Sequence, residues 1–112
     1  MNRIIEILLY TLKPGTGSDF HKIMQEISVP LHKQVGMDVI AFGNSVHTPD
    51  NYYLIRAYDS LEHLKVSQDN FYASTAWKTG PRIDIISRIE TSIKVVMPLS
   101  LDAIKELRQP NF

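Results

Sequence analysis

A strand-like segment near the amino terminus, residues 3–12, carries apolar side chains on both of its faces. Alternate residues of a strand point to opposite sides of a sheet. One side of this segment is entirely apolar and consists of Ile5, Ile7 and Leu9. The other side is apolar apart from one carboxylate and consists of Ile4, Glu6, Leu8, Tyr10 and Leu12. Such a strand is typical of the centre of a sheet that is covered on each face.

A turn and an amphipathic helix are predicted to follow. Lys13-Pro14-Gly15 ends the strand, and Thr16 with Asp19 has the spacing of a capping box, which opens a helix. Apolar residues then recur at helical spacing: Phe20, Ile23, Met24, Ile27 and Leu31. Pro30 lacks an amide hydrogen and is predicted to kink or end the regular helix, with Gly36 as the final stop.

Two further strands and a second helix come next. Residues 37–46 and 52–58 both alternate in the manner of strands, and the Pro, Asp and Asn residues of 47–51 are typical of a turn. These segments predict a hairpin. Asp59 or Ser60 then caps a helix whose apolar stripe is Leu61, Leu64 and Phe71.

The last third of the chain is predicted to contain short helical turns, a strand and a tail helix. A cap at Ser74 begins one turn, and after Gly80-Pro81 another helical segment carries Ile83, Ile86 and Ile89. Residues 90–97 alternate with a period of two, which predicts a strand. Beyond Pro98, Ser100 is predicted to cap a short helix that carries Leu101, Ile104 and Leu107.

This order predicts an α+β, ferredoxin-like βαββαβ fold with a four-stranded antiparallel sheet. We expect this domain to span residues 1–98 and a short C-terminal helix to follow in residues 99–112. In that topology both helices cover one face of the sheet. The other face would expose the second apolar side of the first strand, so we expect a second copy of the chain to cover it in a closed two-fold homodimer. The tail helix either clasps the partner or folds back on its own subunit.

Composition narrows the functional classes. The 112 residues suit one domain, and 12 basic residues balance 12 acidic ones, which argues against a nucleic-acid partner. The chain has no cysteine, and no run approaches the roughly 20 apolar residues that cross a bilayer. The charged amino-terminal segment is a poor signal peptide, so we expect a cytoplasmic protein without a membrane partner.

Three motifs resemble the NIPSNAP family of the dimeric α+β barrel superfamily: Glu6–Gly15 with its Tyr-Thr-Leu-Lys-Pro-Gly ending, the Ala57–Leu61 corner, and Tyr72–Trp77. The resemblance covers residues 5 to about 98. It implies a homodimer whose two sheets form a barrel. The family often has an arginine where this chain has Leu8, and a charged residue where it has Leu64. The superfamily includes cofactor-independent monooxygenases and muconolactone-isomerase-like enzymes, so the fold alone does not select a reaction.

The strand over 52–58 has two different faces. We expect Tyr53, Ile55 and Ala57 to contact the helices, and Leu54, Arg56 and Tyr58 to face the interior of the barrel. Arg56 would then lie opposite Glu6 on the neighbouring strand. Two interpretations remain open: a buried ion pair that satisfies only itself, or a site in which Arg56 binds a carboxylate or enolate-like ligand while Tyr10 and Tyr58 donate hydrogen bonds.

The aromatic residues and histidines give weaker signals. Four aromatic side chains can either line a ligand cavity or belong to the core: Tyr10, Tyr58, Tyr72 and Trp77. The histidines have no metal-binding spacing, and we expect those on the helices, including His21 and His32, to be solvated. His63, beside the Asp59 corner, is the candidate acid or base because imidazole titrates near neutrality.

Two functional hypotheses follow. In the first, each subunit of a homodimer binds an apolar or aromatic small molecule and catalyses a cofactor-free oxygenase or isomerase step, without a metal. The candidate catalytic residues are Arg56, Tyr58 and His63, and the candidate substrate-binding residues are Glu6, Tyr10, Leu54, Tyr72 and Trp77. In the second, the dimer is a non-catalytic binding or structural protein with a packed interior.

Overall fold

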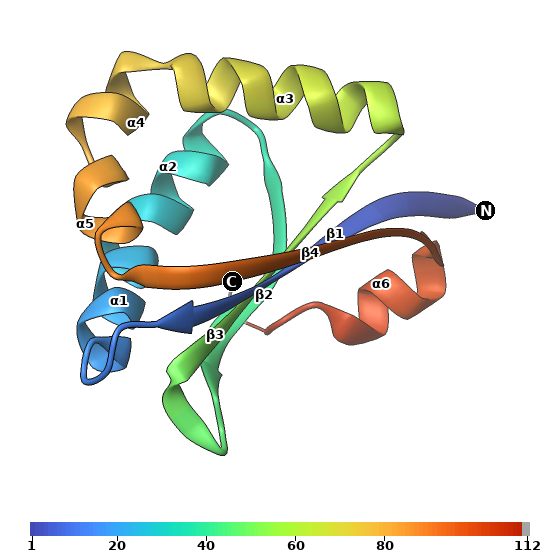
Figure 1. Ribbon diagram of the computed structural model, residues 1–112. Helices are drawn as coiled ribbons and strands as arrows, with labels where there is room; N and C mark the ends of the chain where they lie inside the picture. The colour runs from blue at the N-terminus through green and yellow to red at the C-terminus, as the bar shows by residue number, and fades with distance from the viewer. Residues whose placement is uncertain (111–112) are drawn as a thin grey trace.

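The computed structural model describes residues 1–110 and shows a four-stranded antiparallel sheet with helices, the α+β ferredoxin-like arrangement (Figure 1). The strands are β1 (Asn2–Leu12), β2 (Asp38–Ser45), β3 (Thr48–Tyr58) and β4 (Ile89–Ser100), in the order β2-β3-β1-β4. The strands β1 and β3 are therefore central, as predicted. The edge strand β4 continues three residues beyond the predicted end and includes Pro98, which an edge strand tolerates.

The first helical region consists of α1 (Gly17–Ile23), a π-helical turn η1 (Met24–Ser28) and α2 (Val29–Gln34). Pro30 lies in the first turn of α2, where a missing amide hydrogen costs little. The wider π turn has more residues per turn than an α-helix, so the side chains that follow it point in a different direction from the one that regular helical spacing predicts. Ile27, predicted to lie in the core, is therefore 46% exposed. Val29 is buried, and so is His32, so the expectation that His32 is solvated was wrong.

The start of α1 differs from the predicted capping box. The Thr16 hydroxyl donates to the Lys13 carbonyl and does not cap the helix. Instead, the Asp50 carboxylate accepts hydrogen bonds from the amides of Gly15 and Gly17, at 3.0 and 2.9 Å. A side chain at Gly17 would meet the Pro49 carbonyl, so the β2–β3 hairpin holds the beginning of α1 directly.

The second helical region is divided into α3 (Leu61–Ala73), α4 (Thr75–Thr79) and α5 (Arg82–Ile86). The predicted caps are confirmed: the hydroxyls of Ser60 and Ser74 accept from the amides of His63 and Trp77. Phe71 is buried, but Leu61 is 64% exposed and does not belong to the core.

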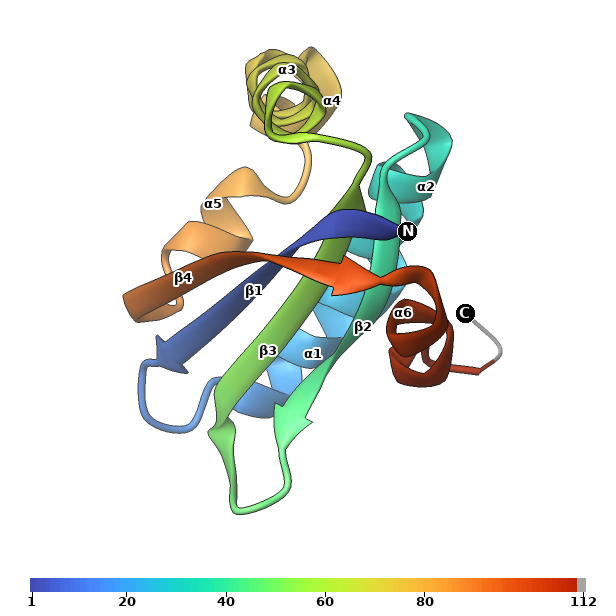
Figure 2. The same ribbon diagram turned by 90° about the vertical axis from the view of Figure 1, so that its right-hand side faces the viewer.

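Helices α1 to α5 lie on one side of the sheet, and α6 (Leu101–Leu107) lies on the other (Figures 1 and 2). Ser100 caps α6, as predicted. Ile104 packs against Ile5, Ile40 and Ala57, so the tail helix folds back on its own subunit. Within residues 1–110, none of the helices has the length and apolar character that crossing a membrane requires.

The two faces of β3 are the reverse of our expectation. Leu54 and Tyr58 belong to the core beneath α1 to α5, and Arg56 points to the same side, whereas Ile55 and Ala57 face α6. Alternation shows that the two faces of a strand differ, but it does not say which face the helices cover. Because β1 is apolar on both sides, its pattern could not decide the question either.

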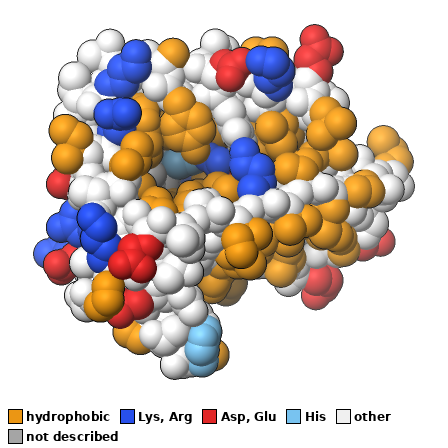
Figure 3. All heavy atoms as spheres, viewed as in Figure 1, with side chains coloured by type: hydrophobic (Ala, Val, Ile, Leu, Met, Phe, Trp, Pro, Cys, Tyr) orange, Lys and Arg blue, Asp and Glu red, His pale blue; other side chains and the backbone are white. Residues whose placement is uncertain are grey.

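The face that carries α6 keeps an apolar surface beyond that helix. Its exposed side chains come from the two adjacent strands β1 and β4: Leu9 (46% exposed), Ile93 (61%), Val95 (46%) and Met97 (37%). Figure 3 shows apolar side chains gathered in a band on the right-hand part of the molecule, beside β4.

Candidate functional site

A buried ion pair joins the two central strands on the helix-covered side. Glu6 lies directly opposite Arg56 in the β1–β3 register. The Nε and Nη2 atoms of Arg56 lie 2.8 and 2.6 Å from Glu6 Oε1, and both side chains are at most 1% exposed. The predicted pairing is therefore present, and it lies under the helices.

The remaining nitrogen of Arg56, Nη1, is also occupied. It donates to His32 Nε2 at 3.1 Å and to the Tyr72 hydroxyl at 2.9 Å. The Nδ1 atom of His32 lies 2.7 Å from the Ser28 carbonyl, which can only accept, so Nδ1 carries the hydrogen and Nε2 is the acceptor. Burial, together with the Arg56 charge, lowers the pKa of His32 to about 4 and keeps the imidazole neutral.

The second carboxylate oxygen of Glu6 contacts two further elements. Gln68 of α3 donates to it at 2.6 Å and also to the Tyr58 hydroxyl at 3.1 Å, and the Lys94 ammonium of β4 lies 3.2 Å away. Burial alone would raise the pKa of Glu6, but Arg56, the hydrogen bond from Gln68 and the Lys94 charge together lower it. Glu6 is therefore ionised at neutral pH and is not a candidate acid.

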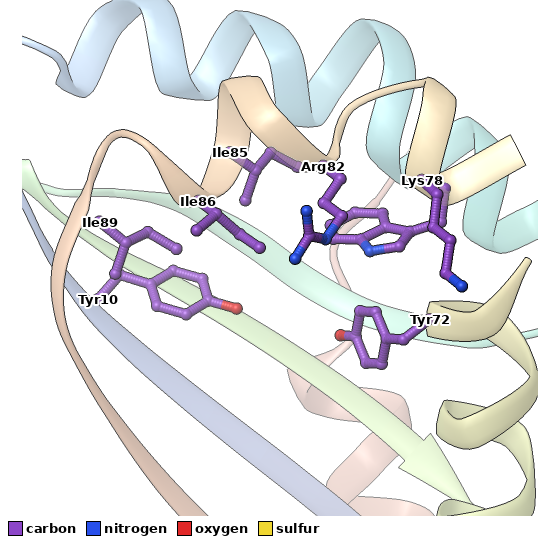
Figure 4. Close-up of a pocket in the computed structure, with 8 residues that line it drawn as sticks. Tyr10, Tyr72, Lys78, Arg82, Ile85, Ile86 and Ile89 are labelled. Atoms are coloured by element: carbon purple, nitrogen blue, oxygen red, sulfur yellow. The ribbon is translucent and has the colours of Figure 1, made fainter. Parts of the chain in front are cut away.

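A cavity of about 590 Å³ opens beside this network, between β1 and the α3–α5 region. Its lining is formed by Tyr10, Tyr72, Trp77, Lys78, Arg82, Ile85, Ile86 and Ile89. Figure 4 shows the hydroxyls of Tyr10 and Tyr72 pointing toward one another across it. Burial raises the pKa of Tyr10, so this phenol stays protonated at neutral pH and can donate.

Tyr72 connects the cavity to the buried network. Its oxygen accepts a hydrogen bond from Arg56, so its own O–H hydrogen is directed elsewhere. A phenol whose oxygen accepts from a buried guanidinium is polarised and becomes a stronger donor. The Trp77 ring packs edge-on against Tyr72, with centroids 5.2 Å apart, and fixes the position of the ring.

The structure brings together some of the predicted site residues and separates others. Tyr10, Tyr72 and Trp77 line the cavity, and Arg56 with Glu6 lies behind Tyr72. Leu54 and Tyr58 are core residues. His63 lies at the start of α3, where its Nδ1 accepts from the Asp59 amide, and it is not part of the cavity lining.

Four further residues of the site were not predicted: His32, Gln68, Lys78 and Arg82. His32 had a signal, because it continues the four-residue spacing of Phe20, Met24 and Ser28. Gln68, Lys78 and Arg82 occupy polar helix positions that differ in no visible way from solvated ones. Within residues 1–110, the acidic, histidine and cysteine side chains form no group of three that could hold a metal.

The sequence matches no protein-family model and no curated protein. Solved structures are similar in fold. A NIPSNAP domain protein from Burkholderia xenovorans is 20% identical with a TM-score of 0.75, over 88% of this chain and 95% of that one. A NIPSNAP family protein from Agrobacterium tumefaciens is 15% identical with a TM-score of 0.80, over 92% and 90%.

A third similar structure comes from a protein described as a proposed antibiotic biosynthesis monooxygenase. This Bordetella bronchiseptica protein is 17% identical with a TM-score of 0.67, and the match covers 90% of this chain and 100% of that one. At these identities the comparison concerns the fold. The chain has the ferredoxin-like α+β fold of the NIPSNAP family proteins, as the motifs in its sequence indicated.

Proposed function

We propose that the protein binds an apolar or aromatic small molecule in the cavity and stabilises negative charge on one of its oxygens. The observation that carries this proposal is the hydrogen bond from Arg56 to Tyr72, which leaves the Tyr72 hydroxyl free to donate into the cavity. Tyr10 supplies a second donor from the opposite side. Apolar walls with a few convergent polar groups are typical of small-molecule sites.

The chemistry that this arrangement suits is the stabilisation of a phenolate or enolate. Two donors directed at one oxygen stabilise an anion as an oxyanion hole does. Both an isomerisation of an enolisable ligand and a cofactor-free oxygenation of a phenol pass through such an anion. A protein of the same fold is described as a proposed monooxygenase, so the fold is compatible with this class of reaction.

The second candidate is a binding protein without turnover. One specific observation favours it: the described lining of the cavity contains neither a carboxylate nor an imidazole that could remove a proton from a ligand. The oxygen consumption or isomerisation of bound compounds separates the two candidates, since a binding protein would return its ligand unchanged.

The Tyr72→Phe variant tests the proposed function. We expect phenols such as 1-naphthol to stabilise the wild-type protein in a thermal-shift assay, and the affinity from calorimetry to fall about tenfold in Tyr72→Phe, because one hydrogen bond to the ligand oxygen is lost. The affinity for 1-methoxynaphthalene, which lacks the hydroxyl, should change little.

The matched control is Tyr53→Phe, since Tyr53 lies on the other face of the sheet. This variant should bind 1-naphthol as the wild type does. A panel of phenols, quinones and aromatic acids from which no compound binds the wild type would overturn the proposal. An unchanged 1-naphthol affinity in Tyr72→Phe would also overturn the proposal, because the proposal rests on the Tyr72 hydroxyl.

We also propose that the protein is a homodimer, in which a second copy covers the apolar face of β1 and β4. Light scattering after size exclusion should give the dimer mass at micromolar concentration. Val95→Glu should give the monomer mass, because it would place a charge in the proposed contact. Ile83→Glu, at an exposed position (70%) on the helical side, is the control and should remain dimeric. A monomeric wild type would refute the dimer.

A further inference from the structure

We infer that the ligand of the cavity is an aromatic or apolar carboxylate, whose anionic group is recognised by Arg82 and Lys78 and not by Arg56. This inference rests on the proposed binding function and names the class of its ligand. It depends on three features of the described residues: the contacts of Arg56, the charges of the cavity lining, and the shape of its walls.

Arg56 is already occupied. All three nitrogens of its guanidinium have partners within hydrogen-bond distance, in Glu6, His32 and Tyr72, and the side chain is 1% exposed. A ligand carboxylate could reach Arg56 only by displacing one of these groups. Separating a buried ion pair costs several kcal/mol, which a single new contact does not return. Arg56 therefore acts on the cavity through Tyr72.

Arg82 and Lys78 are available. They stand on either side of the Gly80-Pro81 turn, at the end of α4 and the start of α5, and both line the cavity while remaining exposed to solvent. Within residues 1–110 neither has an acidic partner among the ion pairs. Figure 4 shows the Arg82 guanidinium reaching toward the space between Tyr10 and Tyr72.

The charge of the lining favours an anion. It contains two cationic side chains and no carboxylate, and the nearest buried carboxylate, Glu6, is already neutralised by Arg56 and Lys94. Figure 3 shows that this side of the molecule is hollowed between the helices and β4, with basic side chains at the edge of the hollow. A concave site lined by one sign of charge attracts and retains the opposite sign.

The apolar walls of the cavity indicate the shape and polarity of the part of the ligand that carries no charge. The isoleucines of α5 and of the start of β4 line the cavity beside Arg82, and Trp77 lines it from α4. A flat, apolar body would bury against this surface, while its carboxylate pairs with the fork of Arg82 at the open end. The volume of about 590 Å³ accommodates a ligand of fused rings.

The test uses matched acid and amide pairs with one, two and three fused rings: benzoate, 2-naphthoate and 2-anthroate against their primary amides. Calorimetry on the wild type should show at least one pair in which the acid binds more tightly than the amide, by about fivefold or more. In the double variant R82A/K78A, this ratio should fall to within about twofold, because the acid loses more affinity than the amide does. Arg82→Lys, which keeps the charge but not the planar fork, should retain part of the preference.

The control is Lys105→Ala, which removes an exposed cation from α6, on the opposite face of the sheet. It should leave both affinities as they are. Equal binding of acid and amide by the wild type, or a preference that survives in R82A/K78A, would overturn this inference and leave the proposed function standing. If no acid and no amide binds while 1-naphthol does, the inference fails and the proposed function stands. If 1-naphthol does not bind either, the proposed function fails together with the inference.

Discussion

Replacing Glu6 by Gln should lower the free energy of unfolding by about 3–5 kcal/mol, which is the cost of leaving one charge of a buried pair without its partner. The Arg56 guanidinium is 1% exposed, and two of its three nitrogens contact the Glu6 carboxylate. An amide at this position keeps the shape but removes the charge, and its nitrogen would meet donors. Urea denaturation at pH 7 measures the change.

A double-mutant cycle separates the pair from its surroundings. Glu6→Leu combined with Arg56→Met should cost much less than the sum of the two single changes, because no unpaired charge remains in the core. The matched control is Lys65→Gln, which breaks the exposed pair between Lys65 and Asp69 and should leave stability unchanged within error. Additive single and double effects would show that Glu6 and Arg56 do not depend on each other.

The free energy of unfolding should also fall as the pH drops from about 6.5 to about 4, because His32 takes up a proton only in the unfolded chain. The pKa of His32 is about 4 in the folded protein, against an ordinary value of 6.5. In this range the unfolded chain binds a proton that the folded protein excludes, so protons favour unfolding. The full contribution, about 3 kcal/mol, is present above pH 6.5 and is lost progressively as the pH falls to 4.

Protonation of Glu6 extends the loss of folding stability to lower pH. Its pKa is lowered from the ordinary 4.5, so it contributes stability above that value and loses it as the pH falls through the folded pKa. In His32→Gln, the pH dependence between 6.5 and 4.5 should flatten, because the amide can donate to Ser28 and accept from Arg56 without titrating. An unchanged, wild-type slope in His32→Gln would contradict the role of His32.

Local features of the fold could be predicted because they depend on neighbouring residues. The serine caps at Ser60, Ser74 and Ser100 satisfy amides three residues away, so a short motif is sufficient to identify them. The order of the strands and the pairing of Glu6 with Arg56 followed from the alternation of each strand and from the topology that the elements allowed. The similarity to NIPSNAP family proteins depended on motifs of the same local kind.

The site itself combines residues whose separate signals are weak. Its cavity draws on β1, α3, α4, α5 and the start of β4, and Lys78 and Arg82 belong to it only because the Gly80-Pro81 turn brings both to one edge. In the sequence, such residues look like the solvated face of a helix. The π turn before Pro30 had a similar effect, because it rotated His32 into the core and Ile27 out of it.

The sequence by itself therefore determined the elements, their order and the existence of a central strand that must be covered on both sides. Only the tertiary structure decided which side the five helices cover, and the physical reason lies in that same strand. Because β1 is apolar on both faces, either face could have been buried under α1 to α5 with a similar gain from the hydrophobic effect. The choice depended on how the helices pack, and it placed Arg56 behind Tyr72 and left Leu9 and Val95 on the open face.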